Sequence, residues 1–150
     1  MTLNTADMLT LAGVTFAFLT WLITHLKSQK ELKLHNTINL INNLSVVEHL
    51  QQADISIRKI MLAGKISENE ALSPETEKAL VTLLDYYEFL AELYWNKTIN
   101  RKAVSHLRGG LMTQLFLWSK PYIQSQREIQ TRSDLWQKFE KLSMAVAKEK

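Results

Sequence analysis

The segment from Asn96 to Gly110 holds the side chains best suited to bind an anionic ligand. Asn100 is expected to cap a helix that starts at Arg101, and a helix start offers a phosphate free N–H groups and the positive end of the helix dipole. Basic and hydroxyl side chains recur at spacings of three and four residues, so they share helix faces. The pattern predicts an anion or nucleotide pocket. Its candidate ligand-binding residues are Asn96, Lys97, Asn100, Arg101, Lys102, Ser105, His106 and Arg108.

Catalytic and metal chemistry find no comparable support in the sequence. It contains no cysteine, no phosphate-binding glycine loop and no zinc-protease motif. Asp85, Glu88 and Glu92 form a stripe at i, i+3 and i+7, but metal sites of that kind in helical bundles need Glu-x-x-His partners, which this chain lacks. We therefore expect an exposed acidic face, no metal site, no cofactor, no catalytic residues and a protein that is not an enzyme.

Opposite charges are separated along the chain. Residues 68–92 contain seven acidic residues and one lysine, whereas residues 97–132 contain seven basic residues and one glutamate. One interpretation is mutual attraction between neighbouring antiparallel helices or between subunits. The other is that the basic segment receives an anionic ligand, which the chain's formal net charge of +3 permits without requiring it.

The clearest single element is the uncharged stretch from Met8 to Leu26. As a helix it would extend about 28 Å, close to the hydrocarbon thickness of a bilayer. Trp21 lies near one end, where aromatic residues often mark the interface. A secretory signal peptide would need a basic leader and a small-residue cleavage site, and a buried core helix would show a polar stripe; neither pattern is evident. The stretch therefore predicts a transmembrane helix.

The flanks of this stretch predict its orientation. No Lys or Arg precedes residue 27, and Lys27, Lys30 and Lys33 follow directly. The positive-inside rule then predicts a single pass through the inner, cytoplasmic membrane with the N-terminus outside. The expected organisation is a short external N-terminus (1–7), the span (8–26), a juxtamembrane connector (27–44) and a cytoplasmic helical domain (45–150).

Beyond the span, the apolar residues follow the helical period, and the predicted fold class is all-α. The connector is expected to be a short helix or an extension of the span, and the domain a small bundle of four or five short helices that oligomerises. Gly64 should end its first helix, and residues 65–72 should form a loop. Gly109-Gly110 should interrupt a later helix, as a kink or as a site of close helix approach, and Pro121 should bend or split it. The expected N-caps are Ser45 (in a capping box with Glu48), Ser73, Asn100 and Ser133.

Two stretches carry a resemblance to known proteins. Leu84-Asp85-Tyr86-Tyr87-Glu88-Phe89-Leu90 and Trp118-Ser119-Lys120-Pro121-Tyr122-Ile123 resemble a bacterial family of uncharacterised membrane-anchored helical proteins. The full-length outline is also similar to small membrane effectors of type III CRISPR systems, whose cytoplasmic domain binds a cyclic oligoadenylate messenger. That resemblance implies that Asn96–Gly110 is the messenger site.

Three functional hypotheses follow. The resemblance implies an oligomeric effector of antiviral defence that binds a cyclic oligoadenylate and then perturbs or permeabilises the membrane. The residues alone favour a membrane-tethered adaptor that docks a protein partner and binds no nucleotide. A third hypothesis is a binder of lipid headgroups or nucleic acid at the inner membrane surface, although no long nucleic acid is expected. Replacing Arg101 or Arg108 with alanine should abolish ligand binding without unfolding the domain.

Overall fold

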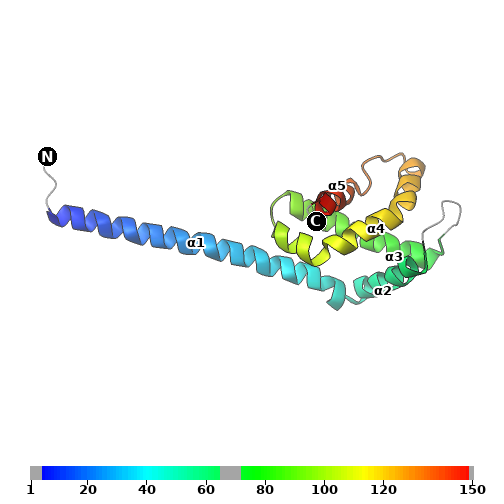
Figure 1. Ribbon diagram of the computed structural model, residues 1–150, viewed down its shortest axis with the longest axis horizontal. Helices are drawn as coiled ribbons and strands as arrows, with labels where there is room; N and C mark the ends of the chain where they lie inside the picture. Colours follow the sequence, from blue (N-terminus) through cyan, green and yellow to red (C-terminus); the bar gives the residue numbers. More distant parts are fainter. Residues whose placement is uncertain (1–4, 65–71, 149–150) are drawn as a thin grey trace.

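In a computed structural model, the described residues, 5–64 and 72–148, form five helices and no strand (Figure 1). This confirms the all-α prediction and the small helical bundle. Residues 1–4 and most of the predicted loop, residues 65–71, lie outside the described residues, as do the side chains at positions 5–9, 11 and 12. The helices are α1 (Thr5–Val46), α2 (Glu48–Ala63), α3 (Pro74–Trp95), α4 (Arg101–Ile129) and α5 (Gln137–Lys148).

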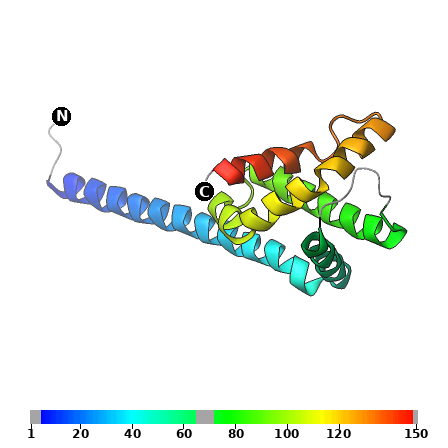
Figure 2. The same ribbon diagram turned by 45° about the vertical axis from the view of Figure 1, so that its right-hand side comes forward.

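Helix α1 is one continuous helix of 42 residues with two different environments. Its first half extends away from the bundle, and its second half packs against α2 and α4 (Figures 1 and 2). The predicted connector, 27–44, is part of this helix, so it is an extension of the predicted span. Thr37, Ile41 and Leu44 from this segment are buried, so the bundle includes residues assigned to the connector from sequence.

The predicted transmembrane helix is not supported by the described residues. None of the helices they form holds a stretch long and apolar enough to cross a membrane. Positions 8, 9, 11 and 12 of the predicted span are among those whose side chains are not described. The span therefore stays a prediction.

Helix α3 is the centre of the bundle and packs against α2, α4 and α5. Its predicted apolar stripe is confirmed, since Leu80, Leu84, Tyr87 and Leu90 are fully buried. Its cap is also confirmed, because Ser73 Oγ accepts a hydrogen bond from the backbone N–H of Thr76 at 3.2 Å.

Two other helix boundaries were predicted wrongly. Ser45 caps nothing, because α1 continues through Val46; α2 begins at Glu48, and Val47 precedes it without a side-chain cap. Ser133 is not a cap either, since α5 begins only at Gln137. Gly64 does end α2, as predicted, with a φ of 150° that favours glycine.

Gly109 marks a close helix approach, one of the two expected outcomes for the Gly109-Gly110 pair, and α4 is not interrupted there. Helix α4 runs through both glycines and through Pro121, although its ribbon bends in the C-terminal part (Figure 1). A Cβ atom on Gly109 would lie 2.3 Å from Val146 Cγ1 of α5. The glycine is therefore what lets α4 and α5 pack together here.

The acidic stripe of α3 positions α5. Asp85 accepts a hydrogen bond from the indole N–H of Trp136 at 2.8 Å, and Glu88 accepts from the backbone N–H groups of Lys138 and Phe139, where a helix start favours negative charge. Glu92 forms an ion pair with Lys138. The expected exposed acidic face is found in part: Asp85 is exposed, whereas Glu88 and Glu92 are half-buried, and all three carboxylates bind residues at or just before the start of α5.

Trp136 is held in an unusual backbone conformation. Its φ of 51° is rare for a bulky residue, while its side chain is 95% buried and its ring stacks on Tyr122 at 6.2 Å between centroids. Packing and the Asp85 hydrogen bond offset the backbone strain. No sequence pattern predicts this turn.

The bundle should lose stability at alkaline pH through its buried tyrosines. Burial raises the pKa of Tyr86 to about 12 and raises the pKa values of Tyr87 and Tyr122 further. Their contribution to the free energy of unfolding is complete below pH 10.0, the ordinary tyrosine pKa. It is lost as the pH rises through the pKa values of the folded state, because in this range the tyrosines of the unfolded chain ionise more readily than those of the folded chain. Unfolding free energies measured at rising pH should decline above about pH 10. A flat profile up to pH 12 would contradict this.

Candidate functional site

The start of the basic segment is built into the end of α3. Asn96 follows the last residue of α3, and its side-chain N–H donates to Glu92 at 2.6 Å. Arg101 Nε and Nη2 donate to the backbone carbonyls of Tyr94 and Trp95 at 2.9 and 3.2 Å. The Arg101 guanidinium carbon also lies 5.0 Å from the centre of the Tyr94 ring.

These contacts give Arg101 a structural role. The last carbonyls of a helix lack partners within the helix and carry the negative end of its dipole, which a guanidinium satisfies. Removing Arg101 would take away a donor to both carbonyls as well as a cation, although the Tyr94 carbonyl would keep the backbone N–H of Lys97 at 3.2 Å. The expectation that Arg101→Ala abolishes ligand binding without unfolding the domain stays a prediction, and the stability of this variant must be measured beside its ligand binding.

Asn100 caps α4 as predicted, and it also joins the bundle to α1. Its Oδ1 accepts from the Ala103 N–H at 3.1 Å. Its own backbone N–H donates to Thr37 Oγ1 at 2.8 Å, and that hydroxyl donates to the Lys33 carbonyl. The free N–H groups of this helix start are therefore partly used within the chain.

Ser105 and Arg108 lie deeper, beneath α1. Arg108 Nη2 reaches the Ile41 carbonyl at 3.4 Å, and Tyr86 Oη donates to the neighbouring Leu40 carbonyl at 2.7 Å. The Ser105 hydroxyl and Arg108 Nε are buried without a hydrogen-bond partner among the described residues. Arg108 has no carboxylate within 4.0 Å in the described ranges. A guanidinium N–H and a hydroxyl buried in this state are unusual, and their hydrogen-bonding capacity is unused in the described structure.

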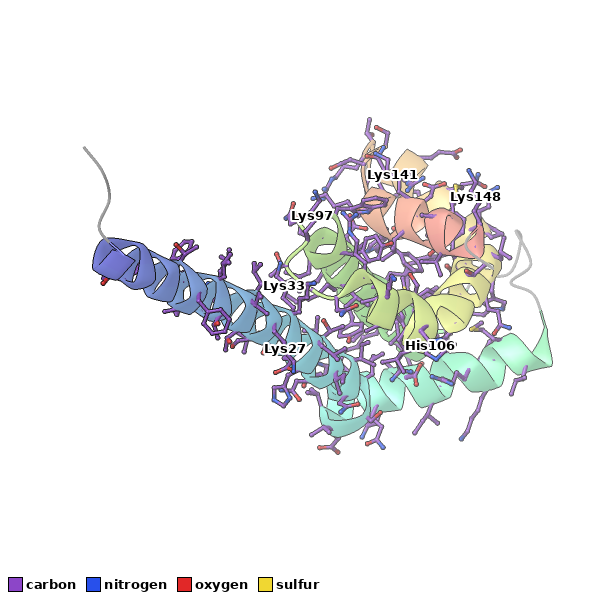
Figure 3. The ribbon with its side chains drawn as sticks, turned by 60° about the vertical axis from the view of Figure 1, so that its left-hand side comes forward. Lys27, Lys33, Lys97, His106, Lys141 and Lys148 are labelled. Carbon is purple, nitrogen blue, oxygen red and sulfur yellow. The ribbon has the colours of Figure 1, made fainter. Side chains whose placement is uncertain are left out.

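The remaining candidates point outward. Lys97, Lys102 and His106 are exposed. Lys97 has a φ of 57° in the turn between α3 and α4, and its carbonyl accepts from Lys33 Nζ at 3.1 Å. Figure 3 shows Lys33 and Lys97 together at the end of the bundle from which α1 extends. The eight predicted residues thus fall into three groups. Asn96 and Arg101 bind the end of α3, and Asn100 and Arg108 bind α1, with the buried hydroxyl of Ser105 in the same helix. Lys97, Lys102 and His106 are exposed basic side chains.

Sequence reasoning missed Lys33 and Thr37 as partners of the basic segment, and it missed Tyr86 as a further contact between the bundle and α1. All three bind backbone atoms across the junction between α1 and the bundle. Thr37 stands four residues after Lys33, on the face that also carries Ile41 and Leu44, so an extension of the helical period through the connector could have identified it. No sequence pattern identified Tyr86 as a contact of α1, because it stands among the apolar residues of the α3 stripe and was interpreted as one of them.

The first half of α1 presents apolar side chains without a cover in the described structure. Phe16 is 74% exposed and Ile23 is 66% exposed, and Val14, Phe18, Leu19, Trp21 and Leu26 are exposed as well. Phe16 and Phe18 are separated by about 200° around the helix, so the apolar surface is not a single stripe. Exposed apolar surfaces of this kind are typical of segments that contact a membrane or another protein.

Comparison with known proteins gives a family and no function. The family described as a domain of unknown function (DUF4760) matches residues 8–145. Since this range covers nearly the whole chain, the chain belongs to that family. No curated protein and no solved structure matches it.

Proposed function

We propose that this DUF4760 chain is a membrane-tethered helical module, anchored by residues 8–26, whose bundle docks a protein partner at the cytoplasmic face. The observation that carries the proposal is the projecting half of α1, with large apolar side chains exposed on nearly opposite sides. A protein groove would cover one side of a helix, whereas lipid covers all of it.

The part of α1 between the predicted span and the bundle has a length that suits this arrangement. The helix from Leu26 to Lys33, whose side chain makes the first described contact with the bundle, extends about 10 Å. The headgroup layer on one side of a bilayer occupies roughly 5–8 Å. The bundle would therefore stand just beyond the headgroups, and the continuous helix would fix its distance from the membrane.

The charges at this junction support the proposed orientation. Lys27, Lys30 and Lys33 are exposed along the intervening stretch, and Lys97 is exposed beside Lys33 at the end of the bundle. Lysines beside a cytoplasmic leaflet contribute about 1 kcal/mol each through attraction to anionic headgroups. Lys33 and Lys97 would then face lipid phosphates.

Fractionation of the full chain tests the proposal. Expressed in a bacterial host, the chain should sediment with membranes, resist extraction at high salt and at alkaline pH, and dissolve in detergent. Resistance to salt separates an embedded helix from a purely electrostatic contact, which is screened. A chain that remains in the supernatant at physiological salt would contradict the proposal.

A cyclic oligoadenylate effector is the second candidate, favoured by one observation. Ser105 Oγ and Arg108 Nε are buried and unpaired, as expected of groups that await an anion. Binding of one cyclic oligoadenylate to the full chain in detergent, lost in Arg108→Gln and kept in Lys102→Gln, would support it. Absence of binding across a panel of ring sizes would leave the adaptor as the function.

A further inference from the structure

The turn between α3 and α4, residues 96–100, lies at the end of the bundle from which α1 projects (Figures 1 and 2). Lys33 Nζ of α1 donates to the Lys97 carbonyl of this turn at 3.1 Å, which links the two elements directly. Residues 95–98 are all exposed. The turn is therefore on the side of the bundle that faces the proposed anchor.

Trp95 ends α3 with an indole ring that is held in place but only partly covered. Trp95 is 39% exposed. The centre of its ring lies 5.3 Å from the centre of the Tyr94 ring and 5.8 Å from the guanidinium carbon of Arg101, which also donates to the Trp95 carbonyl. An exposed aromatic ring with a polar N–H is the kind of side chain that concentrates at the boundary between water and lipid.

The exposed charges beside Trp95 are positive. Lys33 and Lys97 lie together, and within the described ranges neither has a carboxylate within 4.0 Å, although like charges repel. Glu92, three residues before Trp95, is half-buried and forms an ion pair with Lys138. An anionic surface at this end of the bundle would offset the repulsion between the two lysines.

The length of α1 brings these side chains within reach of lipid. The helix from Leu26 to Lys33 extends about 10 Å and the headgroup layer occupies roughly 5–8 Å, so the remaining gap is about 2–5 Å. The bundle lies to one side of α1 (Figures 1 and 2). Membrane helices tilt by about 20° on average, and a tilt of α1 towards that side would close the gap at the turn.

We propose that this turn is a second membrane contact, in which Trp95 enters the headgroup layer of the anionic leaflet beside α1 while Lys33 and Lys97 bind its lipid phosphates. The inference rests on the proposed anchor and adds a contact that fixes the tilt of the bundle. The indole contributes apolar burial and an N–H donor, and the lysines contribute attraction to anionic headgroups. The opposite end of the bundle, where α2 and α4 end, then faces away from the membrane (Figure 1).

Quenching by a headgroup label in the full chain tests this contact. Because the chain contains no cysteine, Thr98→Cys places a single fluorophore in the exposed turn, and Ile129→Cys places one at the far end of α4, where Ile129 is 71% exposed. Each chain is reconstituted in nanodiscs of phosphatidylcholine, alone or mixed with phosphatidylserine, with a spin-labelled headgroup lipid as the quencher. We expect several-fold stronger quenching at position 98 than at position 129, and an increase at position 98 in the anionic nanodiscs.

Two variants of the turn separate docking from simple proximity. Trp95→Ala should lower the ratio of docked to undocked turns, obtained from the quenching at position 98, by about tenfold or more, because it removes the apolar surface that lipid would cover. Lys97→Asn should lower that ratio about fivefold in the anionic nanodiscs alone. Asparagine tolerates the φ of 57° at this position, so Lys97→Asn tests the contact without disturbing the turn.

Each variant has a matched control on another face of the bundle. Phe89→Ala truncates a ring that is 52% exposed on α3, and Lys59→Asn removes an exposed lysine of α2. Both should leave the quenching at position 98 unchanged. Near-ultraviolet circular dichroism checks that every variant is folded.

The same quenching at position 98 in both lipids and in both turn variants would overturn the inference, because α1 alone would then hold the turn near the membrane. Equal effects of Trp95→Ala and Phe89→Ala would overturn it as well. Membrane attachment is measured independently by fractionation. A chain that sediments with membranes but shows no dependence on Trp95 removes only this inference, whereas one that stays in the supernatant removes the proposed anchor and this inference with it.

Discussion

Replacing Phe16 and Ile23 with lysine should release the chain from membranes. The two side chains are 74% and 66% exposed and lie near the middle and the C-terminal end of the apolar half of α1. A lysine near the centre of a membrane helix costs about 2.5–3.5 kcal/mol, and the second substitution adds a smaller amount near the interface. We expect most of the double variant to appear in the supernatant after fractionation in which the wild type sediments.

The matched control places the same charges where α1 already meets water. Ser28→Lys and Gln29→Lys add two lysines between Lys27 and Lys30, where the structure exposes every side chain. This control should sediment like the wild type, because basic residues belong at the cytoplasmic flank. Both variants should keep the bundle folded, since neither site contacts it. Sedimentation of the Phe16 and Ile23 variant at the wild-type level would show that these positions are not embedded in lipid.

Gly109→Ala should destabilise the bundle by about 2 kcal/mol. The new Cβ would lie 2.3 Å from Val146 Cγ1, and Val146 is almost fully buried, with the stiff side chain of a β-branched residue in a helix. Alanine gains up to about 1 kcal/mol of helix propensity over glycine, and the steric strain exceeds that gain. Near-ultraviolet circular dichroism during unfolding of the full chain in detergent measures the change.

The sign of this effect should reverse when Val146 is truncated. In a Val146→Ala background the clashing Cγ1 is absent, so Gly109→Ala should be neutral or stabilising by as much as about 1 kcal/mol. A double-mutant cycle gives the coupling directly. If Gly109→Ala costs the same in both backgrounds, the close approach of α4 and α5 is not what requires the glycine.

Local signals in the sequence predicted the middle of the bundle well. Ser73 and Asn100 are caps as expected, because a small polar residue before a helical pattern satisfies free N–H groups wherever the helix packs. The apolar stripe of α3 is long and periodic, so its burial followed from spacing alone. Ser45 met the same local rule and failed, since packing of Ile41 and Leu44 keeps α1 helical past that position.

The candidate site was less predictable because cations have several uses. Arg101 looks the same in a sequence whether its guanidinium meets a phosphate or the carbonyls at the end of α3. The acidic stripe was similarly ambiguous, since a carboxylate can face water or hold the start of another helix, as Glu88 does for α5. Only the tertiary arrangement distinguishes these roles.

Single-cysteine labelling in intact membranes tests the proposed anchor most directly. The chain contains no cysteine, so Phe18→Cys and Leu34→Cys each introduce one thiol into α1, at sites that are both exposed in the structure. With membranes opened to the reagent on both sides, a water-soluble maleimide should label position 34 and leave position 18 unlabelled until detergent is added. Rapid labelling of position 18 without detergent would contradict the account, because it would place the apolar half of α1 in water.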